Sequence, residues 1–178
     1  MTLYTIGHGM RTAQELIDAL QSFDVRLVAD VRAYPRSRTN PQFNEDTLRQ
    51  TLASAAIAYE HWRSLGGRRR GRGDASPNAA WHHPAFRAYA DYMMEDAFWS
   101  ALDTLLAQAA QTVTAVMCSE TLWWRCHRRM ISDAAVARGA QVFHIMRPGV
   151  VVPHQLPAWA HVVGDRVSYA GASSGVQA

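Results

Sequence analysis

The sequence contains no lysine, so all 18 of its basic residues are arginines. This absence excludes a Schiff-base lysine and a Walker-type phosphate loop, because both need a lysine amine. An anion bound by this protein would therefore meet guanidinium groups, which make forked hydrogen bonds to carboxylates and phosphates. The formal net charge is only +3 at pH 7. A phosphate-bearing partner is thus compatible with the composition but is not required by it.

Cysteine is also scarce, and no apolar stretch is long enough to cross a membrane. The first residues lack the basic start and the long apolar stretch of a signal peptide. We therefore expect a cytoplasmic protein with no membrane partner. In a reducing compartment its two cysteines, Cys118 and Cys126, should be free thiols that are reactive, metal-bound or simply buried, rather than a structural disulfide.

What the sequence does contain is a regular alternation of short apolar runs and amphipathic segments. We expect strands at 3–6, 25–31, 57–61, 112–117 and 141–145, and helices from 12, around 48–52, over 86–110 in two pieces, and over 125–138. This order favours an α/β domain over residues 1–170, with three layers and a mostly parallel central sheet of about five strands covered by helices on both faces. Residues 161–169 are compatible with a hairpin, and residues 171–178 with a disordered tail.

One segment, residues 118–129, carries both cysteines. Cys118 directly follows a β-branched apolar run, so it should lie at the carboxyl end of a buried strand, where parallel sheets bind ligands. Nearby arginines and the start of the next helix would lower the pKa of a cysteine by favouring its thiolate. The candidate catalytic residues are therefore Cys118, Glu120, Cys126 and His127.

Two further strands are also followed by polar residues. His8 lies between two glycines after the first strand, and Asp30 and Arg32 lie at the end of the second. If these strands neighbour the one before Cys118, their polar ends converge on one site. The candidate substrate-binding residues are His8, Asp30, Arg32 and Arg128. A purely structural alternative remains open, in which His8 bonds to the backbone of a turn and Asp30 pairs with Arg32.

Three functions remain open on the residues alone. In the first, a cysteine-dependent transferase or hydrolase acts on an anionic small-molecule substrate. In the second, Cys118 and Cys126 bind a metal with a histidine or Glu120, although their spacing matches no common zinc module. In the third, a loop with arginines at 68, 69, 70 and 72 binds nucleic acid weakly and without specificity. The sequence identifies no cofactor and no oligomeric state.

The chain resembles a family of bacterial and archaeal proteins known as domain of unknown function 488. The resemblance rests on Thr5-Ile6-Gly7-His8, Asp30-Val31-Arg32 with Pro35 and Ser37, Phe43, Gly66-Gly67, Phe86 with Tyr89-Ala90, Cys118 with Glu120, Cys126-His127-Arg128, and Val142 with His144-Ile145. It implies an uncharacterised α/β protein with suspected enzymatic activity, and it implies no particular reaction.

A looser likeness is to rhodanese-type domains. Residues 27–32 resemble the strand of such domains that ends in Asp-Val-Arg, and residues 116–118 resemble the strand that ends in their cysteine. The loop after Cys118 contains Glu120 and two tryptophans but no glycine, whereas an anion cradle needs small residues and free backbone donors. This difference argues against a sulfurtransferase or a phosphatase.

Overall fold

A six-stranded sheet forms the centre of the computed structural model, which describes residues 1–170. The strands are β1 (Thr2–Gly7), β2 (Leu27–Asp30), β3 (Ala58–His61), β4 (Thr114–Cys118), β5 (Gln141–Arg147) and β6 (Val150–Pro153), in the spatial order β3-β2-β4-β1-β5-β6. β1 to β5 are parallel, and β6 is antiparallel to β5. The expected α/β fold with a mostly parallel sheet is confirmed. The predicted disordered tail, residues 171–178, lies outside the described residues.

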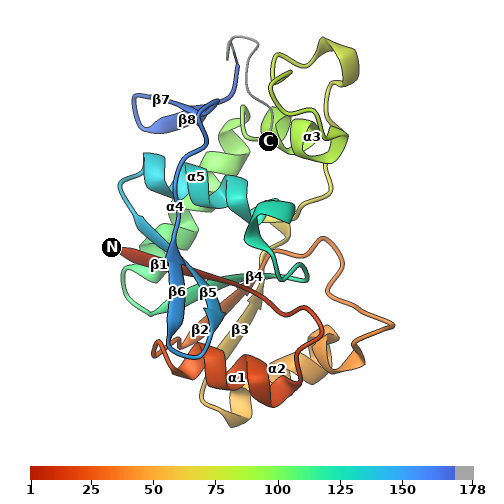
Figure 1. Ribbon diagram of the computed structural model, residues 1–178, viewed down its shortest axis with the longest axis vertical. Helices are drawn as coiled ribbons and strands as arrows, with labels where there is room; N and C mark the ends of the chain where they lie inside the picture. The colour runs from red at the N-terminus through yellow and green to blue at the C-terminus, as the bar shows by residue number, and fades with distance from the viewer. Residues whose placement is uncertain (171–178) are drawn as a thin grey trace.

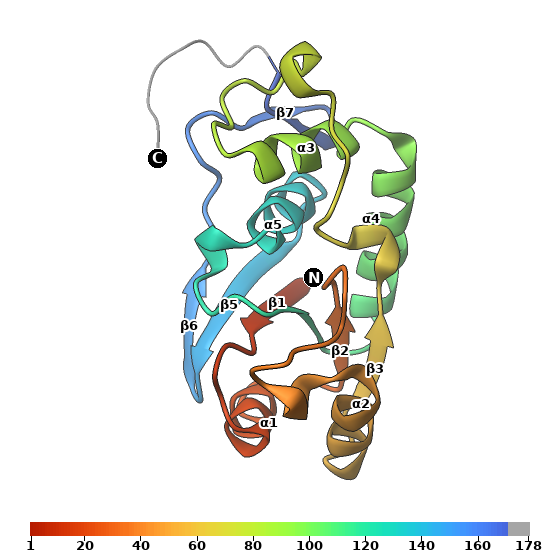
Figure 2. The same ribbon diagram turned by 90° about the vertical axis from the view of Figure 1, so that its right-hand side faces the viewer.

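Helices cover both faces of this sheet, as the three-layer prediction requires (Figure 2). Helices α1 (Ala13–Gln21) and α2 (Glu45–Ser54) lie on one side, and α4 (Asp96–Ala109) and α5 (Arg128–Ala137) lie on the other. Beyond α5 lie α3 (Pro84–Tyr92) and a separate hairpin of β7 (His161–Val163) and β8 (Arg166–Ser168) (Figure 1). This hairpin turns at the predicted position, with Gly164 at a φ of +66°.

Two elements differ from the sequence prediction. The unpredicted β6 is a run of valines that pairs with β5 after a tight turn at Gly149, where φ is +74°. Helix α5 begins at Arg128 rather than at Arg125, because residues Trp123–Arg125 form a separate 3₁₀ turn. This later start places Cys126 and His127 in the chain that enters the helix instead of on the helix itself.

Each face of the sheet has its own apolar core, because alternate residues of a strand point to opposite faces. In β1, Leu3 belongs to the core under α4 and α5, whereas Ile6 belongs to the core under α1 and α2. Both residues are fully buried. Burial on both faces explains why the strands are nearly continuous apolar runs. No helix within residues 1–170 is both long and apolar enough to cross a membrane.

The strand order brings the three polar strand ends together. β4 lies between β2 and β1, and the register aligns Cys118 with Gly7 and Met117 with Asp30. Backbone hydrogen bonds continue past the strands, since the His8 N–H donates to the Cys118 carbonyl over 3.0 Å. The convergence that the sequence left conditional on strand order therefore occurs in the structure.

Gly7 is the position where this arrangement tolerates no side chain. A Cβ added there would lie 1.9 Å from the Glu120 carbonyl oxygen, so the loop after β4 would have to move. We predict that Gly7→Ala lowers the free energy of unfolding by about 1 to 3 kcal/mol, as expected for overpacking. Urea denaturation checks this, and a variant as stable as the wild type would contradict it.

Candidate functional site

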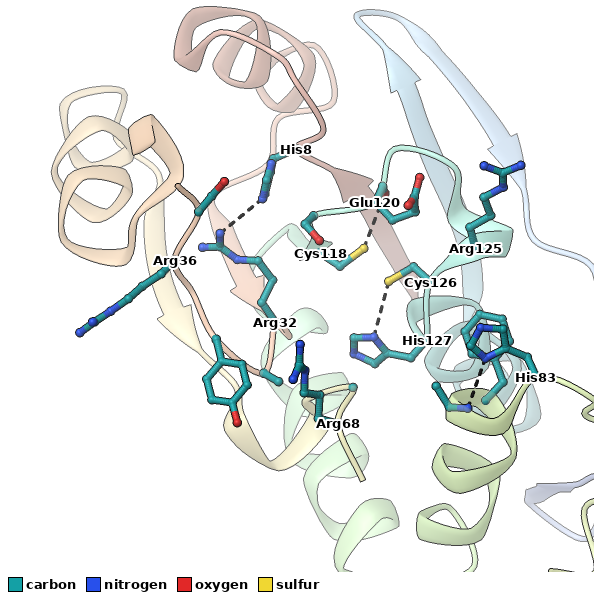
Figure 3. Close-up of a pocket in the computed structure, with 17 residues that line it drawn as sticks. His8, Arg32, Arg36, Arg68, His83, Cys118, Glu120, Arg125, Cys126 and His127 are labelled. Carbon is teal, nitrogen blue, oxygen red and sulfur yellow. Dashed lines mark hydrogen bonds between the residues drawn. The ribbon is translucent and has the colours of Figure 1, made fainter. Parts of the chain in front are cut away.

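A cavity of about 550 Å³ opens at the carboxyl edge of the sheet, where the loops after β1, β2 and β4 meet (Figure 3). We call it the thiol cavity. Of the predicted site residues, the following six line it: His8, Arg32, Cys118, Glu120, Cys126 and His127. The other two, Asp30 and Arg128, do not line it, and they are 0% and 1% exposed. The predicted residues thus gather at one place, with Asp30 and Arg128 buried beside the cavity.

Arg128 organises the loop that carries Cys118. Its Nη1 donates to the Cys118 Sγ over 2.6 Å and also to the Glu120 carbonyl, and its Nη2 donates to the Thr121 carbonyl over 3.0 Å. Its Nε donates to the Thr5 hydroxyl over 3.3 Å. The loop therefore turns carbonyl oxygens, not backbone N–H groups, toward the guanidinium. These contacts hold the loop in place, and they do not by themselves form an anion cradle, which needs backbone N–H donors.

The positive charge of Arg128 has no carboxylate partner, since none of the ion pairs within residues 1–170 includes it. Burying an uncompensated charge costs several kcal/mol, so buried charges are normally paired. The ionisable group in contact with the guanidinium is the Cys118 thiol. A Cys118 thiolate would supply the missing negative charge.

The two thiols have pKa values shifted in opposite directions. Burial alone would raise the pKa of Cys118, but a hydrogen bond from Cys126 and the charge of Arg128 lower it from 9.0 to about 7. Burial and the neighbouring Cys118 raise the pKa of Cys126 well above its ordinary value. Because the pKa of Cys118 is about 7, Cys118 carries the negative charge of the pair above that pH, and Cys126 keeps its proton. Figure 3 shows the two sulfurs facing each other at the centre of the cavity.

His127 is neutral and supports Cys126 from the other side. Its Nε2 lies 3.1 Å from the Leu65 carbonyl, which only accepts hydrogen bonds, so Nε2 carries the proton. Its Nδ1 is then an acceptor, 3.5 Å from the Cys126 Sγ. Burial lowers the pKa of His127 to about 4. Gly67 makes room for this ring, because a Cβ there would lie 2.5 Å from Nδ1.

Asp30 and Arg32 form the mutual ion pair of the structural alternative. Arg32 Nη2 lies 2.7 Å from Asp30 Oδ2, which also accepts from the Tyr59 hydroxyl over 2.5 Å. Arg32 Nη1 lies 3.3 Å from His8 Nε2, and His8 Nδ1 lies 2.9 Å from the Gly9 carbonyl. Burial lowers the pKa of His8 to about 4. Arg32 and His8 are therefore held rigidly as neighbours in the cavity wall.

Sequence reasoning missed a buried hydrogen-bonded network behind Arg128. From Thr5 it runs to His144 Nδ1 over 2.6 Å, from His144 to His154 over 2.9 Å, and from His154 to Asp133 over 2.6 Å. The Tyr169 hydroxyl donates to the other Asp133 oxygen over 2.5 Å. The only signal in the sequence was polar residues at inward positions of apolar strands, such as Thr5 and His144. The network fixes the Thr5 hydroxyl that accepts from Arg128.

Three further arginines line the thiol cavity, namely Arg36, Arg68 and Arg125. The sequence assigned Arg68 to the arginine loop and left Arg36 and Arg125 out of the predicted site. All three are exposed, and none belongs to an ion pair within residues 1–170. Arg69, next to Arg68, instead folds back with its guanidinium 3.6 Å from the Tyr92 ring centroid and donates to loop carbonyls. The arginine loop therefore contributes one side chain to the cavity and uses another for its own structure.

The donor set for a metal is incomplete within the described residues. No group of three or more histidine, cysteine, aspartate or glutamate side chains in residues 1–170 is arranged to hold a metal ion. Cys118 and Cys126 are close together, but no third side chain of these types completes a set with them within the described residues. The geometry gives the metal-site alternative no specific support.

Three buried histidines make the fold sensitive to acid. Burial lowers the pKa values of His8 and His127 to about 4 and that of His144 to about 2, from 6.5 in the unfolded chain. As the pH falls below 6.5, the unfolded state takes up these protons before the folded state does. We predict that the free energy of unfolding falls from pH 6.5 to pH 5 by up to about 1.4 kcal/mol per pH unit for each histidine.

Urea denaturation of His144→Gln as a function of pH tests this directly. In this variant the free energy of unfolding should fall less steeply as the pH is lowered, because one of the three histidines no longer takes up a proton on unfolding. The control is His161→Gln, at an exposed position, which should keep the wild-type slope. The interval above pH 5 is chosen because burial raises the pKa of Asp133, which acts in the opposite direction at lower pH. Identical slopes in both variants would contradict the burial argument.

Comparison with known families gives one match. The family described as Domain of unknown function DUF488 matches residues 12–135, which is more than half of the chain and includes the loops that carry Arg32, Cys118 and His127. No curated protein and no solved structure matches the chain. Because this match covers more than half of the chain, the chain belongs to the DUF488 family.

Proposed function

We propose that this protein is a cysteine-dependent enzyme in which the Cys118 thiolate attacks an anionic small substrate bound in the thiol cavity. The observation that carries the proposal is the contact between Cys118 and Arg128, a guanidinium that is 1% exposed and lacks a carboxylate partner within residues 1–170. Such a charge favours the thiolate, which is the nucleophilic form of cysteine.

The position of Cys118 suits an attack on a small molecule. The residue is only 3% exposed, yet it lines the thiol cavity, so a reactant reaches the sulfur through that cavity. The volume of about 550 Å³ lies in the usual range for small-molecule sites. A large partner that needed an exposed cysteine would not fit this arrangement.

Cys126 and His127 support proton movement around the nucleophile. The Cys126 thiol keeps its proton at neutral pH, and Cys126 is one of the groups that lower the pKa of Cys118. Its sulfur also lies 3.5 Å from the unprotonated Nδ1 of His127. When Cys118 has used its charge to form a bond to the substrate, the Cys126 proton can turn toward the neutral Nδ1 of His127 without leaving Cys126. In this proposal Cys126 and His127 are the proton partners of the nucleophile.

The cavity wall supplies the groups for an anion. Arg32, Arg36, Arg68 and Arg125 line it, and Glu120 is the only acidic side chain among its described lining residues. We assign anion binding to the arginines and proton transfer to the leaving group to Glu120. The sulfur forms a bond to an electrophilic atom of the substrate, and the leaving group departs with the bonding electron pair and a proton. Water or a second substrate then releases the product, as in hydrolases and transferases.

Asp30 and Arg128 receive positioning roles in this proposal, because neither lines the thiol cavity. Asp30 fixes the Arg32 guanidinium through a bidentate contact, and Arg128 fixes the Cys118 loop. Nucleic acid remains the alternative ligand. It is less favoured, because Arg69 of the arginine loop packs on Tyr92 instead of presenting its charge outward.

Alkylation of the thiols tests the choice of nucleophile. We predict that iodoacetamide labels Cys118 before Cys126 near pH 7, and that Cys118→Ser abolishes this early labelling. Cys126→Ala should slow labelling at pH 7 several-fold, because Cys118 loses the hydrogen bond that helps to lower its pKa. Peptide mass spectrometry identifies the labelled residue. A Cys118 that reacts only after unfolding would end the nucleophile role.

Protection by a simple anion tests the binding wall. We predict that sulfate slows iodoacetamide labelling of Cys118, and that replacing Arg36, Arg68 and Arg125 together by glutamine reduces this protection at least several-fold. Arg70→Gln is the matched control, because Arg70 is exposed but does not line the thiol cavity. Equal protection in the triple variant and the control would show that sulfate does not act at this site.

A further inference from the structure

A second cavity of about 510 Å³ lies next to the thiol cavity, and we call it the tryptophan cavity. Its aromatic lining residues are Trp81, Phe86, Trp124 and Trp159. Trp81 and Trp159 meet edge to face, with ring centroids 5.4 Å apart and an interplanar angle of 87°. These residues come from the loop before α3, from α3 itself, from the turn after β4 and from the segment before β7. Four separate parts of the chain thus build one aromatic wall.

The tryptophan cavity is also positively charged. Arg129 lines it, with its guanidinium carbon 4.9 Å from the Trp81 ring centroid and 5.8 Å from that of Trp159. Arg129 donates to the Trp124 carbonyl over 3.0 Å, and no ion pair within residues 1–170 includes it. A cavity with a resident cation repels positively charged ligands and attracts electron-rich or anionic ones.

Two indole N–H groups of this cavity have no acceptor. The Nε1 atoms of Trp81 and Trp159 are buried and make no hydrogen bond to any described residue. Trp81 is only 4% exposed. An unpaired buried donor costs about 1 to 3 kcal/mol, so buried indole N–H groups are normally paired. By contrast, Trp62 and Trp99 donate to Glu60 and to the Met93 carbonyl. The two unpaired donors therefore belong to the residues that build the tryptophan cavity.

The two cavities adjoin, because His83, Phe86, Glu120 and Arg125 line both of them. Arg125 is exposed, so a molecule in the thiol cavity that displaces this side chain can extend into the tryptophan cavity. Figure 3 shows Arg125 and His83 on the same side of the thiol cavity as Cys126, away from Arg36. A ligand that filled both parts would place one end among the arginines near Cys118 and the other between aromatic rings.

We infer that the tryptophan cavity holds a planar heteroaromatic ring, rich in hydrogen-bond acceptors, that is joined to an anionic group bound in the thiol cavity. This is the chemistry of a nucleoside monophosphate. A flat ring matches the aromatic walls, and the phosphate meets guanidinium forks. The indole donors are buried in the free protein, so a small rotation of Trp81 or Trp159 on binding would bring an unpaired N–H to a carbonyl or ring-nitrogen acceptor of the ring. The inference rests on the proposed function, for which it names the substrate class.

The test compares three probes by isothermal titration calorimetry on the full chain. Adenosine monophosphate carries both the ring and the anion, ribose 5-phosphate lacks the ring, and adenosine lacks the anion. We expect adenosine monophosphate to bind at least ten-fold more tightly than either fragment. Equal affinities for adenosine monophosphate and ribose 5-phosphate, equal affinities for adenosine monophosphate and adenosine, or no binding of any probe would each overturn the inference.

Conservative variants locate the ring. Trp159→Phe keeps an aromatic ring but removes the N–H donor, so it should weaken adenosine monophosphate binding several-fold and leave ribose 5-phosphate binding unchanged. Trp62→Phe is the control, because Trp62 does not line the tryptophan cavity, and it should alter neither. Loss of affinity in both variants, or in neither, would contradict the assignment. If Cys118 proves unreactive while these binding results hold, the proposed chemistry fails and the ligand class stands.

Discussion

Arg128 carries its positive charge at a position that is 1% exposed, and no carboxylate of residues 1–170 pairs with it. Its donors hold the Cys118 sulfur, two carbonyls of the loop after β4 and the Thr5 hydroxyl. The loop conformation and the state of the thiol depend on this one guanidinium, and the buried network beyond Thr5 holds the hydroxyl that it contacts. Because the ionisable group in contact with this buried cation is a thiol, the simplest way to stabilise the cation is to ionise that thiol to a thiolate.

The groups around Arg128 are arranged so that the negative charge is carried by Cys118. Burial keeps His8, His127 and His144 neutral, with pKa values of about 4 or lower. Burial and the adjacent thiolate keep the proton on Cys126. No neighbouring group therefore competes with Cys118 for the negative charge at neutral pH. The exposed arginines of the cavity wall, Arg36, Arg68 and Arg125, remain available to a substrate, because none of them belongs to an ion pair within residues 1–170.

Local patterns predicted the fold and part of the site, because strand runs and strand-end residues are properties of neighbouring positions. Cys118, His8 and Arg32 were found in this way, and the strand order β2-β4-β1 joins them. Other features depend on contacts between residues that are far apart in the chain, and local sequence patterns do not predict such contacts. The missing counter-ion of Arg128, the contact of His144 with Thr5 and the meeting of Trp81 with Trp159 are of this kind. The antiparallel β6 was missed because its pairing depends on the turn at Gly149.

The proposed function requires a thiolate at Cys118, and the ultraviolet absorbance of thiolates detects that group directly. The measurement is a pH titration of this absorbance in the folded protein, with the Cys118→Ser spectrum subtracted at each pH. The account predicts that one thiolate per chain appears with a midpoint near pH 7, the pKa that Arg128 and Cys126 give to Cys118. No thiolate signal until the pH rises above the ordinary cysteine value of about 8.5 would contradict it.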